Sequence, residues 1–258
     1  MLRKRLALEL KSFLDNNQVD IFHSSDIFKH FPNVEKRFME KVLQEVTDLE
    51  YTRLEKGKYC RNTFRNEYAI ANALTVDAII AYWSALNIHG LTEQFPNKIY
   101  VQTMKNKNER EIFGVEYQFI RVKSNKLIGF DVTGTGSNKF RISSIEKTIV
   151  DCFDLVEYSG GFMELIRAFY RTKLNGTKLI EYSTAVGNKA AVKRMGFLAE
   201  LLNKNGMKQF IQFAKKFSSD NYDLFDKQGY DEGHHIADWK LKMNMEKSEI
   251  IDIAKSIY

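Results

Sequence analysis

The N-terminal fold is decided by residues 33–61, which read NVEKRFMEKVLQEVTDLEYTRLEKGKYCR. In the first half of this stretch, apolar residues recur at the spacing of one helical face: Val34, Phe38, Val42 and Val46. The pattern predicts a helix that begins at Asn33. Two alternating runs then flank Gly57, which can adopt the positive φ of a tight turn. The second half therefore predicts a β-hairpin with a basic turn.

The residues before this stretch predict two further helices and a short strand. Leucine and phenylalanine side chains place a helix over residues 2–16, and a strand follows at 21–22. Ser24 or Ser25 can cap a short helix after that strand. Helix, short helix, turn, longer helix and hairpin is the order of a winged helix-turn-helix. Residues 1–65 are therefore predicted to form a winged helix-turn-helix DNA-binding domain.

In a winged helix, the third helix enters the major groove of duplex DNA and the hairpin contacts phosphates. The helix residues predicted to face DNA are Asn33, Lys36, Arg37 and Lys41. The wing residues predicted to contact the DNA backbone are Lys56, Lys58 and Arg61. Glutamates in the same helix repel phosphate, so we expect useful affinity to need self-association or repeated half-sites on promoter DNA. A winged helix that contacts only protein is the alternative for this domain.

The remaining residues, 66–258, predict a larger mixed α/β domain with a small sheet and a helical C-terminal half. Expected helices cover 66–74, 75–87, a segment after Ser144, several segments from 161 to 217, and 246–257. Expected strands cover 98–102, 117–122, 126–132, 139–142, and short segments near 222–225 and 239–243. The predicted fold class of the whole chain is therefore α+β.

Composition excludes several classes of protein. Cys60 and Cys152 lie far apart and outside any C-x-x-C pair, so neither a disulfide framework nor a zinc cluster is expected. No run of about 18 uncharged apolar residues is present, and the first residues do not resemble a signal peptide. We expect a cytoplasmic protein that has no membrane partner, no metal and no cofactor.

Charge is distributed unevenly along the chain. The formal net charge of +6 favours an anionic partner. Residues 171–217 contain ten Lys or Arg against Glu181 and Glu200, or +8, which exceeds the net charge of the whole chain. Residues 222–238 contain five Asp or Glu against Lys227. If the fold keeps these two segments apart, the C-terminal half carries a charge dipole.

Five segments together resemble the AbiEi-type antitoxin family. They are GKY at 57–59, WSALNIHGL at 83–91, IYV at 99–101, FRISSIEKTIVD at 140–151 and VGNKAAVKRMGFL at 186–198. The resemblance spans nearly the whole chain and keeps the family's order. No single one of these motifs is as specific as a metal-ligand signature.

The resemblance implies an antitoxin of a type IV toxin–antitoxin system, which acts in abortive infection as a phage defence. Such a protein represses the promoter of its own operon through the winged helix. Its C-terminal domain counters a nucleotidyltransferase-like toxin. Because the basic run falls in the segment similar to the antitoxin domain, the resemblance implies a toxin-neutralising basic surface, with Lys178, Lys189, Lys193 and Arg194 as its candidate residues.

Other functional classes have weaker signals in the sequence, and no catalytic site is expected. Gly134–Lys139 lacks the spacing of a phosphate-binding loop and predicts a hairpin turn. Ser144 lacks the elbow that presents a serine nucleophile, and we interpret it as a helix cap. Asp131 has no acidic-x-lysine partner of the kind that metal-dependent nucleases use. Such a nuclease, and a winged-helix regulator that responds to another ligand, remain the alternatives.

Overall fold

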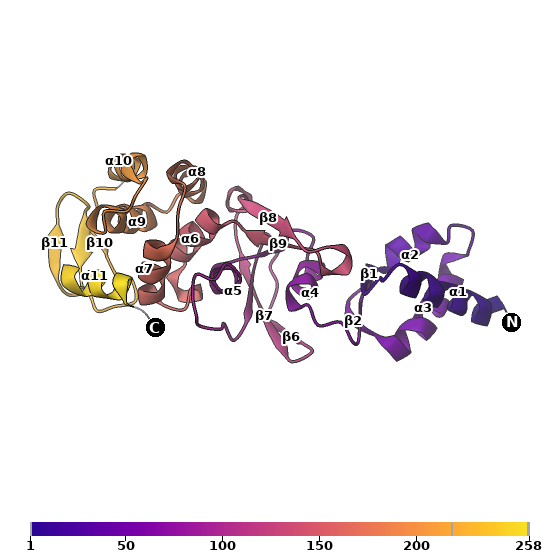
Figure 1. Cartoon of the computed structure of the whole chain (residues 1–258). Coiled ribbons are helices and arrows are strands. Elements are labelled where there is room, and N and C mark those ends of the chain that lie inside the picture. The colour runs from indigo at the N-terminus through magenta and orange to yellow at the C-terminus, as the bar shows by residue number, and fades with distance from the viewer. Residues whose placement is uncertain (1, 218, 257–258) are drawn as a thin grey trace.

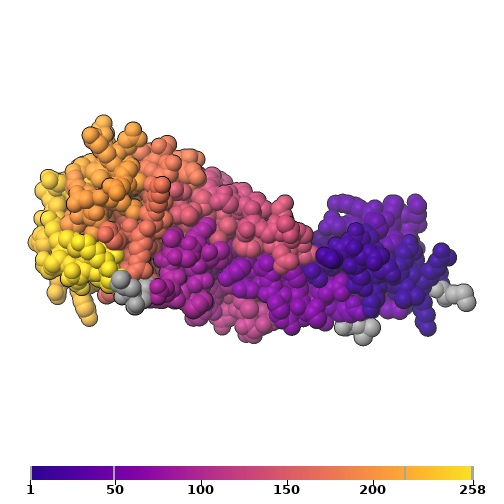
Figure 2. All heavy atoms as spheres, viewed as in Figure 1, coloured from indigo at the N-terminus to yellow at the C-terminus, as the bar shows by residue number. Residues whose placement is uncertain are grey.

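The computed structural model describes residues 2–217 and 219–256 and has a mixed α+β fold, which confirms the predicted fold class. The molecule is elongated, with N-terminal helices at one end, a sheet in the middle, and helices with a small sheet at the other end (Figure 1). The space-filling view shows the two ends of the chain at opposite ends of the molecule (Figure 2). Within the described ranges, no helix is both long and apolar enough to cross a membrane.

The N-terminal unit comprises residues 2–61. Its helices are α1 (Leu2–Asn16), α2 (Ser24–His30) and α3 (Lys36–Glu50), and its strands are β1 (Ile21–His23), β2 (Tyr51–Glu55) and β3 (Lys58–Arg61). The strands form an antiparallel sheet in the order β1-β3-β2. Buried side chains that join the helices and the sheet include Leu10, Leu14, Ile27, Met39 and Val42. The predicted order of helices, strand and hairpin is confirmed.

The start of α3 differs from the prediction. The helix begins at Lys36, three residues after the predicted Asn33. The chain between α2 and α3 forms a turn in which the Val34 N–H donates to the Phe31 carbonyl at 3.2 Å. Val34 therefore lies in the turn before the helix, and its side chain packs against the N-terminal core from that position. Asn33 therefore lies in the turn.

The cap of α2 also differs from the prediction of Ser24 or Ser25. The N-cap residue is His23, which has an extended backbone and whose side chain accepts a hydrogen bond from the Ser25 N–H. The distance from that nitrogen to His23 Nδ1 is 3.1 Å. A ring nitrogen thus satisfies the free amide that the prediction assigned to a serine oxygen.

The central sheet has six strands in the order β6-β7-β5-β4-β9-β8. Its strands are β4 (Ile79–Ile80), β5 (Ile99–Thr103), β6 (Arg110–Ile112), β7 (Val115–Arg121), β8 (Phe130–Thr133) and β9 (Phe140–Ser143). The pairs β5–β7 and β4–β9 are parallel, and the other pairs are antiparallel. The helices α4 (Glu67–Leu74) and α5 (Tyr82–Ile88) lie before and after β4 in the chain. Four of these strands lie where the sequence predicts strands.

The predicted helix over residues 75–87 is wrong in its first half. Ile79 and Ile80 form β4, which lies between β5 and β9 in the middle of the sheet. The chain then turns into α5 at Tyr82, a buried residue with a φ of +55°. A strand of two residues is too short to show an alternating pattern. In the sequence, Ile79 and Ile80 therefore match the apolar face of a helix.

The C-terminal part is mostly helical. Its helices are α6 (Ile145–Asp154), α7 (Phe162–Arg171), α8 (Gly176–Val186), α9 (Lys189–Leu201), α10 (Lys208–Phe217) and α11 (Lys247–Lys255). A small sheet is formed by β10 (Asp223–Leu224), β11 (His234–Ile236) and β12 (Leu241–Met243) in the order β10-β12-β11. The prediction missed β6 and β11. The predicted end of the last helix, Ile257, lies outside the described residues.

The sheet of the N-terminal unit packs against neighbours on both of its faces. Phe22 and Tyr51 belong to the core that holds α1, α2 and α3. Leu54 and Cys60 belong instead to a second core, which contains side chains of α4 and the central sheet. Apolar side chains of the hairpin are therefore buried both against the N-terminal helices and against the larger domain.

Candidate nucleic-acid interface

The N-terminal half of α3 presents an exposed basic face. Lys36, Arg37 and Lys41 are all exposed, and Asn33 is exposed in the turn before them. Met39 of the same helix is buried. In residues 2–217 and 219–256, no carboxylate lies within 4 Å of the three cationic groups. The predicted helix residues thus lie together, with their charges available to an anionic partner.

Contacts between α2 and α3 hold the start of this face. The Lys36 Nζ atom lies 5.7 Å from the centroid of the Phe28 ring, within cation–π distance. Phe28 is half-buried and packs against the N-terminal core. Lys36 is therefore positioned by an aromatic ring that does not neutralise its charge.

The helix α3 also carries acidic groups, one of which, Glu40, lies between Arg37 and Lys41 in the chain. Glu45 pairs with Arg3 of α1 at 2.8 Å, and Glu50 pairs with Lys11 of α1. Glu40 and Asp48 line a groove of about 580 Å³ between α3 and the hairpin, and Arg53 and Lys56 line the same groove from the hairpin. The two carboxylates in this groove repel a nucleic-acid phosphate. The electrostatic attraction to phosphate is therefore concentrated at the cationic side chains of the first turns of α3 and of the hairpin.

The hairpin contributes two exposed cationic side chains, one from its turn and one from β2. Lys56 is exposed, as predicted for a wing residue. Arg53, which the sequence prediction missed, is also exposed, and its Nε donates to the Glu55 carbonyl at 3.2 Å. An alternating pattern could not have identified Arg53, because Thr52 and Arg53 are both exposed between the buried residues Tyr51 and Leu54.

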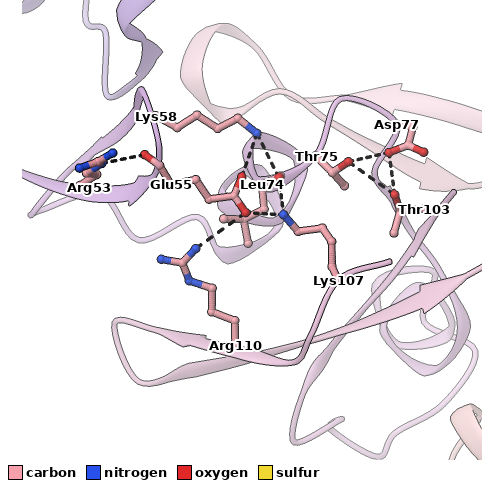
Figure 3. Close-up of polar contacts among 9 residues, drawn as sticks. All are labelled: Arg53, Glu55, Lys58, Leu74, Thr75, Asp77, Thr103, Lys107 and Arg110. Atoms are coloured by element: carbon pink, nitrogen blue, oxygen red, sulfur yellow. Dashed lines mark hydrogen bonds and ion pairs between the residues drawn. The ribbon is translucent and has the colours of Figure 1, made fainter. Parts of the chain in front are cut away.

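Lys58, predicted to contact phosphate from the wing, is directed toward the larger domain. Its Nζ donates to the Leu74 carbonyl at the end of α4 at 3.0 Å and lies 3.3 Å from Glu55 Oε2 (Figure 3). Glu55 also pairs with Lys107, which precedes β6 in the chain, and its Oε1 lies 3.8 Å from Arg110 Nη1. The prediction for Lys58 is corrected, because its ammonium group holds the hairpin to the larger domain.

Arg61 is also committed to protein contacts. Its guanidinium lies 2.8 Å from Asp15, 3.0 Å from Asp20 and 3.8 Å from Glu50. Three carboxylates from three parts of the N-terminal unit thus surround one half-buried arginine. The prediction that Arg61 contacts DNA is corrected, since phosphate would have to displace these partners.

The predicted toxin-neutralising residues separate into two pairs. Lys178 and Lys189 are exposed near the starts of α8 and α9. Lys193 and Arg194 are 0% and 4% exposed, which contradicts their assignment to a surface. Lys193 Nζ donates to Asp223 Oδ2 at 2.7 Å and to the Asn221 carbonyl at 2.5 Å.

Arg194 has a similar internal role. Its Nε donates to the carbonyls of Leu224 and Phe225, both at 3.0 Å, and its Nη2 donates to Leu224 at 2.9 Å. Burial lowers the pKa of Arg194 below the ordinary arginine value. Lys193 and Arg194 therefore attach the strand segment β10 to α9, and sequence alone missed this because the partners lie about 30 residues farther along the chain.

Two titratable side chains near Ser144 in the larger domain have structural partners. A ring nitrogen of His89 is hydrogen-bonded to the Ser143 carbonyl at 2.7 Å. Asp151 is buried and pairs with Lys147 one turn earlier in α6. Asp131 lies on the exposed edge strand β8. In the part of the chain that the structure describes, no group of three His, Cys, Asp or Glu side chains is placed to hold a metal ion.

Comparison with known proteins identifies a similar fold and no family. No family model matches the chain, and no curated protein matches it. The crystal structure of the RV2827C protein from Mycobacterium tuberculosis is similar, with a TM-score of 0.60 over 97% of this chain and 94% of that chain. The two sequences are 12% identical. The likeness shows that the two chains share a mixed α+β fold over nearly their full lengths.

Proposed function

We propose that the N-terminal unit is a winged helix-turn-helix and that the protein is an antitoxin and transcriptional autorepressor of a type IV toxin–antitoxin system. The proposal depends on one observation above all. Lys36, Arg37 and Lys41 are exposed and unpaired, within the described residues, on the helix that follows α2 and precedes the hairpin. This is the position of a recognition helix, whose first turns contact base edges and phosphates in the major groove.

The charge pattern supports cooperative binding of more than one copy. Glu40 and Asp48 are exposed on α3, and Lys56 and Arg53 are the exposed cationic residues among the described residues of the hairpin. One N-terminal unit therefore makes few phosphate contacts, and affinity rises steeply with the number of contacts. Two copies on adjacent half-sites double that number. Repression then depends on repeated sites in the promoter of the protein's own operon.

The antitoxin half of the proposal rests on the sequence resemblance, which spans the larger domain. In this proposal the larger domain counters a nucleotidyltransferase-like toxin encoded in the same operon. Lys178 and Lys189 are the exposed members of the basic set, so they are the residues available to a partner. Lys193 and Arg194 contribute by holding the C-terminal part together.

The proposed function predicts that repression and neutralisation can be separated by mutation. A reporter fused to the upstream DNA of the protein's own gene is expected to be repressed by the wild type and released by a Lys36→Ala/Arg37→Ala variant. The same variant is expected to protect cells that express the operon's nucleotidyltransferase-like toxin, because the substitutions leave the larger domain unchanged. Reporter activity and colony counts measure the two effects.

The control variant is Lys178→Ala/Lys189→Ala, which removes the same charge far along the chain. It is expected to repress the reporter normally. If the wild type fails to repress the reporter, the autorepressor function is wrong. If the wild type represses but gives no protection against the toxin, the protein is a winged-helix regulator of another kind.

A further inference from the structure

The loop between β5 and β6, residues 104–109, belongs to the larger domain but lies against the hairpin of the N-terminal unit. Figure 3 shows the contacts that hold it, with Glu55 and Lys58 coming from the hairpin and Lys107 coming from the loop. Both ends of the loop are tied to neighbouring elements through ionised side chains. The loop is therefore ordered before any partner binds.

The first anchor is Asp77, between α4 and β4. Its Oδ1 accepts hydrogen bonds from the hydroxyls of Thr75 and Thr103, both at 2.6 Å, and its Oδ2 accepts from the Met104 N–H at 2.7 Å. The Lys105 N–H donates in turn to Thr103 Oγ1 at 3.1 Å. Burial raises the pKa of Asp77, but these donors outweigh burial and hold the pKa below its ordinary value. The start of the loop thus has a fixed backbone.

The second anchor is Lys107. Its Nζ pairs with Glu55 of the hairpin, donates to the Leu74 carbonyl at 3.0 Å and lies 5.4 Å from the Phe119 ring centroid. Burial raises the pKa of Glu55, but the hydrogen bonds and charges of Lys107 and Lys58 together outweigh burial and hold the pKa below its ordinary value. The Glu55 carboxylate therefore stays ionised at neutral pH, and its contact with Lys107 fixes the loop beside the hairpin turn that carries Lys56.

On either side of Lys107, the loop exposes groups that donate hydrogen bonds. Lys105, Asn106 and Asn108 are exposed, and Glu109, the acidic residue of the loop, pairs with Lys98. An ammonium group and two amides on an ordered loop match the acceptors of a phosphate backbone. Because the loop is already ordered, DNA binding does not lose the conformational entropy that ordering a flexible loop would cost.

We propose that the β5–β6 loop is a second phosphate-contacting element for duplex DNA, held beside the wing by the Glu55–Lys107 ion pair. The inference rests on the proposed function of the N-terminal unit and adds a contact from the larger domain. Lys105 contacts a phosphate next to those contacted from the hairpin turn. Lys107 is a positioning residue, because its charge pairs with Glu55 and not with a phosphate.

The test compares binding of full-length variants to the protein's own upstream DNA over a salt series. Lys105→Gln is expected to weaken binding about fivefold at 0.1 M salt and to reduce the slope of log affinity against log salt by about 1, as expected for one lost phosphate contact. Lys247→Gln, an exposed lysine at the start of α11, is the matched control and is expected to change neither value. An unchanged slope for Lys105→Gln overturns the proposal.

The role of Lys107 has its own readout. Lys107→Met is expected to weaken binding about as much as Lys105→Gln, and the double variant is expected to be no weaker than either single variant, because a displaced loop cannot use Lys105. Lys107→Arg keeps the pair with Glu55 and is expected to restore binding. Additive losses in the double variant contradict the positioning role.

Failure of this inference is distinguishable from failure of the proposed function. If the wild type binds its upstream DNA specifically but Lys105→Gln behaves like wild type, the winged helix acts alone and the loop does not contact DNA. If the wild type binds no DNA specifically, the proposed function and this inference are both wrong.

Discussion

Replacing Lys36 and Arg37 together with alanine is expected to weaken binding to the operator about 100-fold, since each contact of this kind contributes about 1–3 kcal/mol. The reason is the position of the two side chains, which are exposed on the first turn of α3 and have no carboxylate partner within the described residues. Binding to scrambled DNA is expected to weaken less, because base contacts are lost only from the specific complex. Fluorescence anisotropy with labelled duplexes measures both affinities.

The melting temperature provides the control for this prediction. Neither side chain is buried, so the double variant is expected to unfold within about 0.5 kcal/mol of the wild type, as exposed substitutions do. The charge-matched variant Lys178→Ala/Lys189→Ala is expected to keep specific binding. A Lys36→Ala/Arg37→Ala protein that binds the operator as tightly as the wild type would exclude α3 as the recognition helix.

Replacing Lys193 with methionine is expected to destabilise the protein by about 1–3 kcal/mol, the usual cost of leaving acceptors in the interior without their donor. Lys193 is 0% exposed and donates to Asp223 and to the Asn221 carbonyl. Methionine has a similar length but no donor, so a carboxylate and a carbonyl lose their partner beneath β10. The C-terminal sheet is expected to loosen first.

Urea denaturation measures this effect, with Lys189→Met as the matched control. Lys189 is exposed one turn earlier on α9, so its substitution is expected to change the free energy of unfolding by less than about 0.5 kcal/mol. Equal stabilities of the two variants would mean that Lys193 is not the anchor that the structure describes. Lys193 was a candidate for a toxin-binding surface. Without the stability measurement, a Lys193 variant that fails to neutralise the toxin in cells would be misinterpreted as having lost a contact with the toxin.

Elements with a strong local pattern could be predicted from the sequence. The apolar stripe of α3 continues through Val42 and Val46, and the alternating runs around Gly57 mark the hairpin, so both were found. β4 was missed because Ile79 and Ile80 owe their extended form to pairing with β5 and β9, which lie at least 19 residues away in the chain. Pairing partners at such separations leave no signal in a local window.

The candidate interface shows the same limit for side chains. The exposure of Lys36, Arg37 and Lys41 could be predicted, because the spacing of the apolar residues decides which positions of a helix face solvent. Lys58 and Arg61 could not, because their partners come from α4, α1 and the chain between α1 and β1. A sequence identifies a cationic side chain, but the packing of distant elements decides whether its charge faces solvent or a buried carboxylate.

The central claim is that α3 and the hairpin read promoter DNA, and the most direct measurement is binding of the wild-type protein to its own upstream DNA and to a scrambled duplex over a salt series. The account predicts tighter binding to the upstream DNA by at least about 100-fold near 0.15 M salt, with log affinity falling linearly with log salt for both duplexes. Equal affinity for the two duplexes at every salt concentration would contradict it, and the N-terminal unit would then be a protein-contact module.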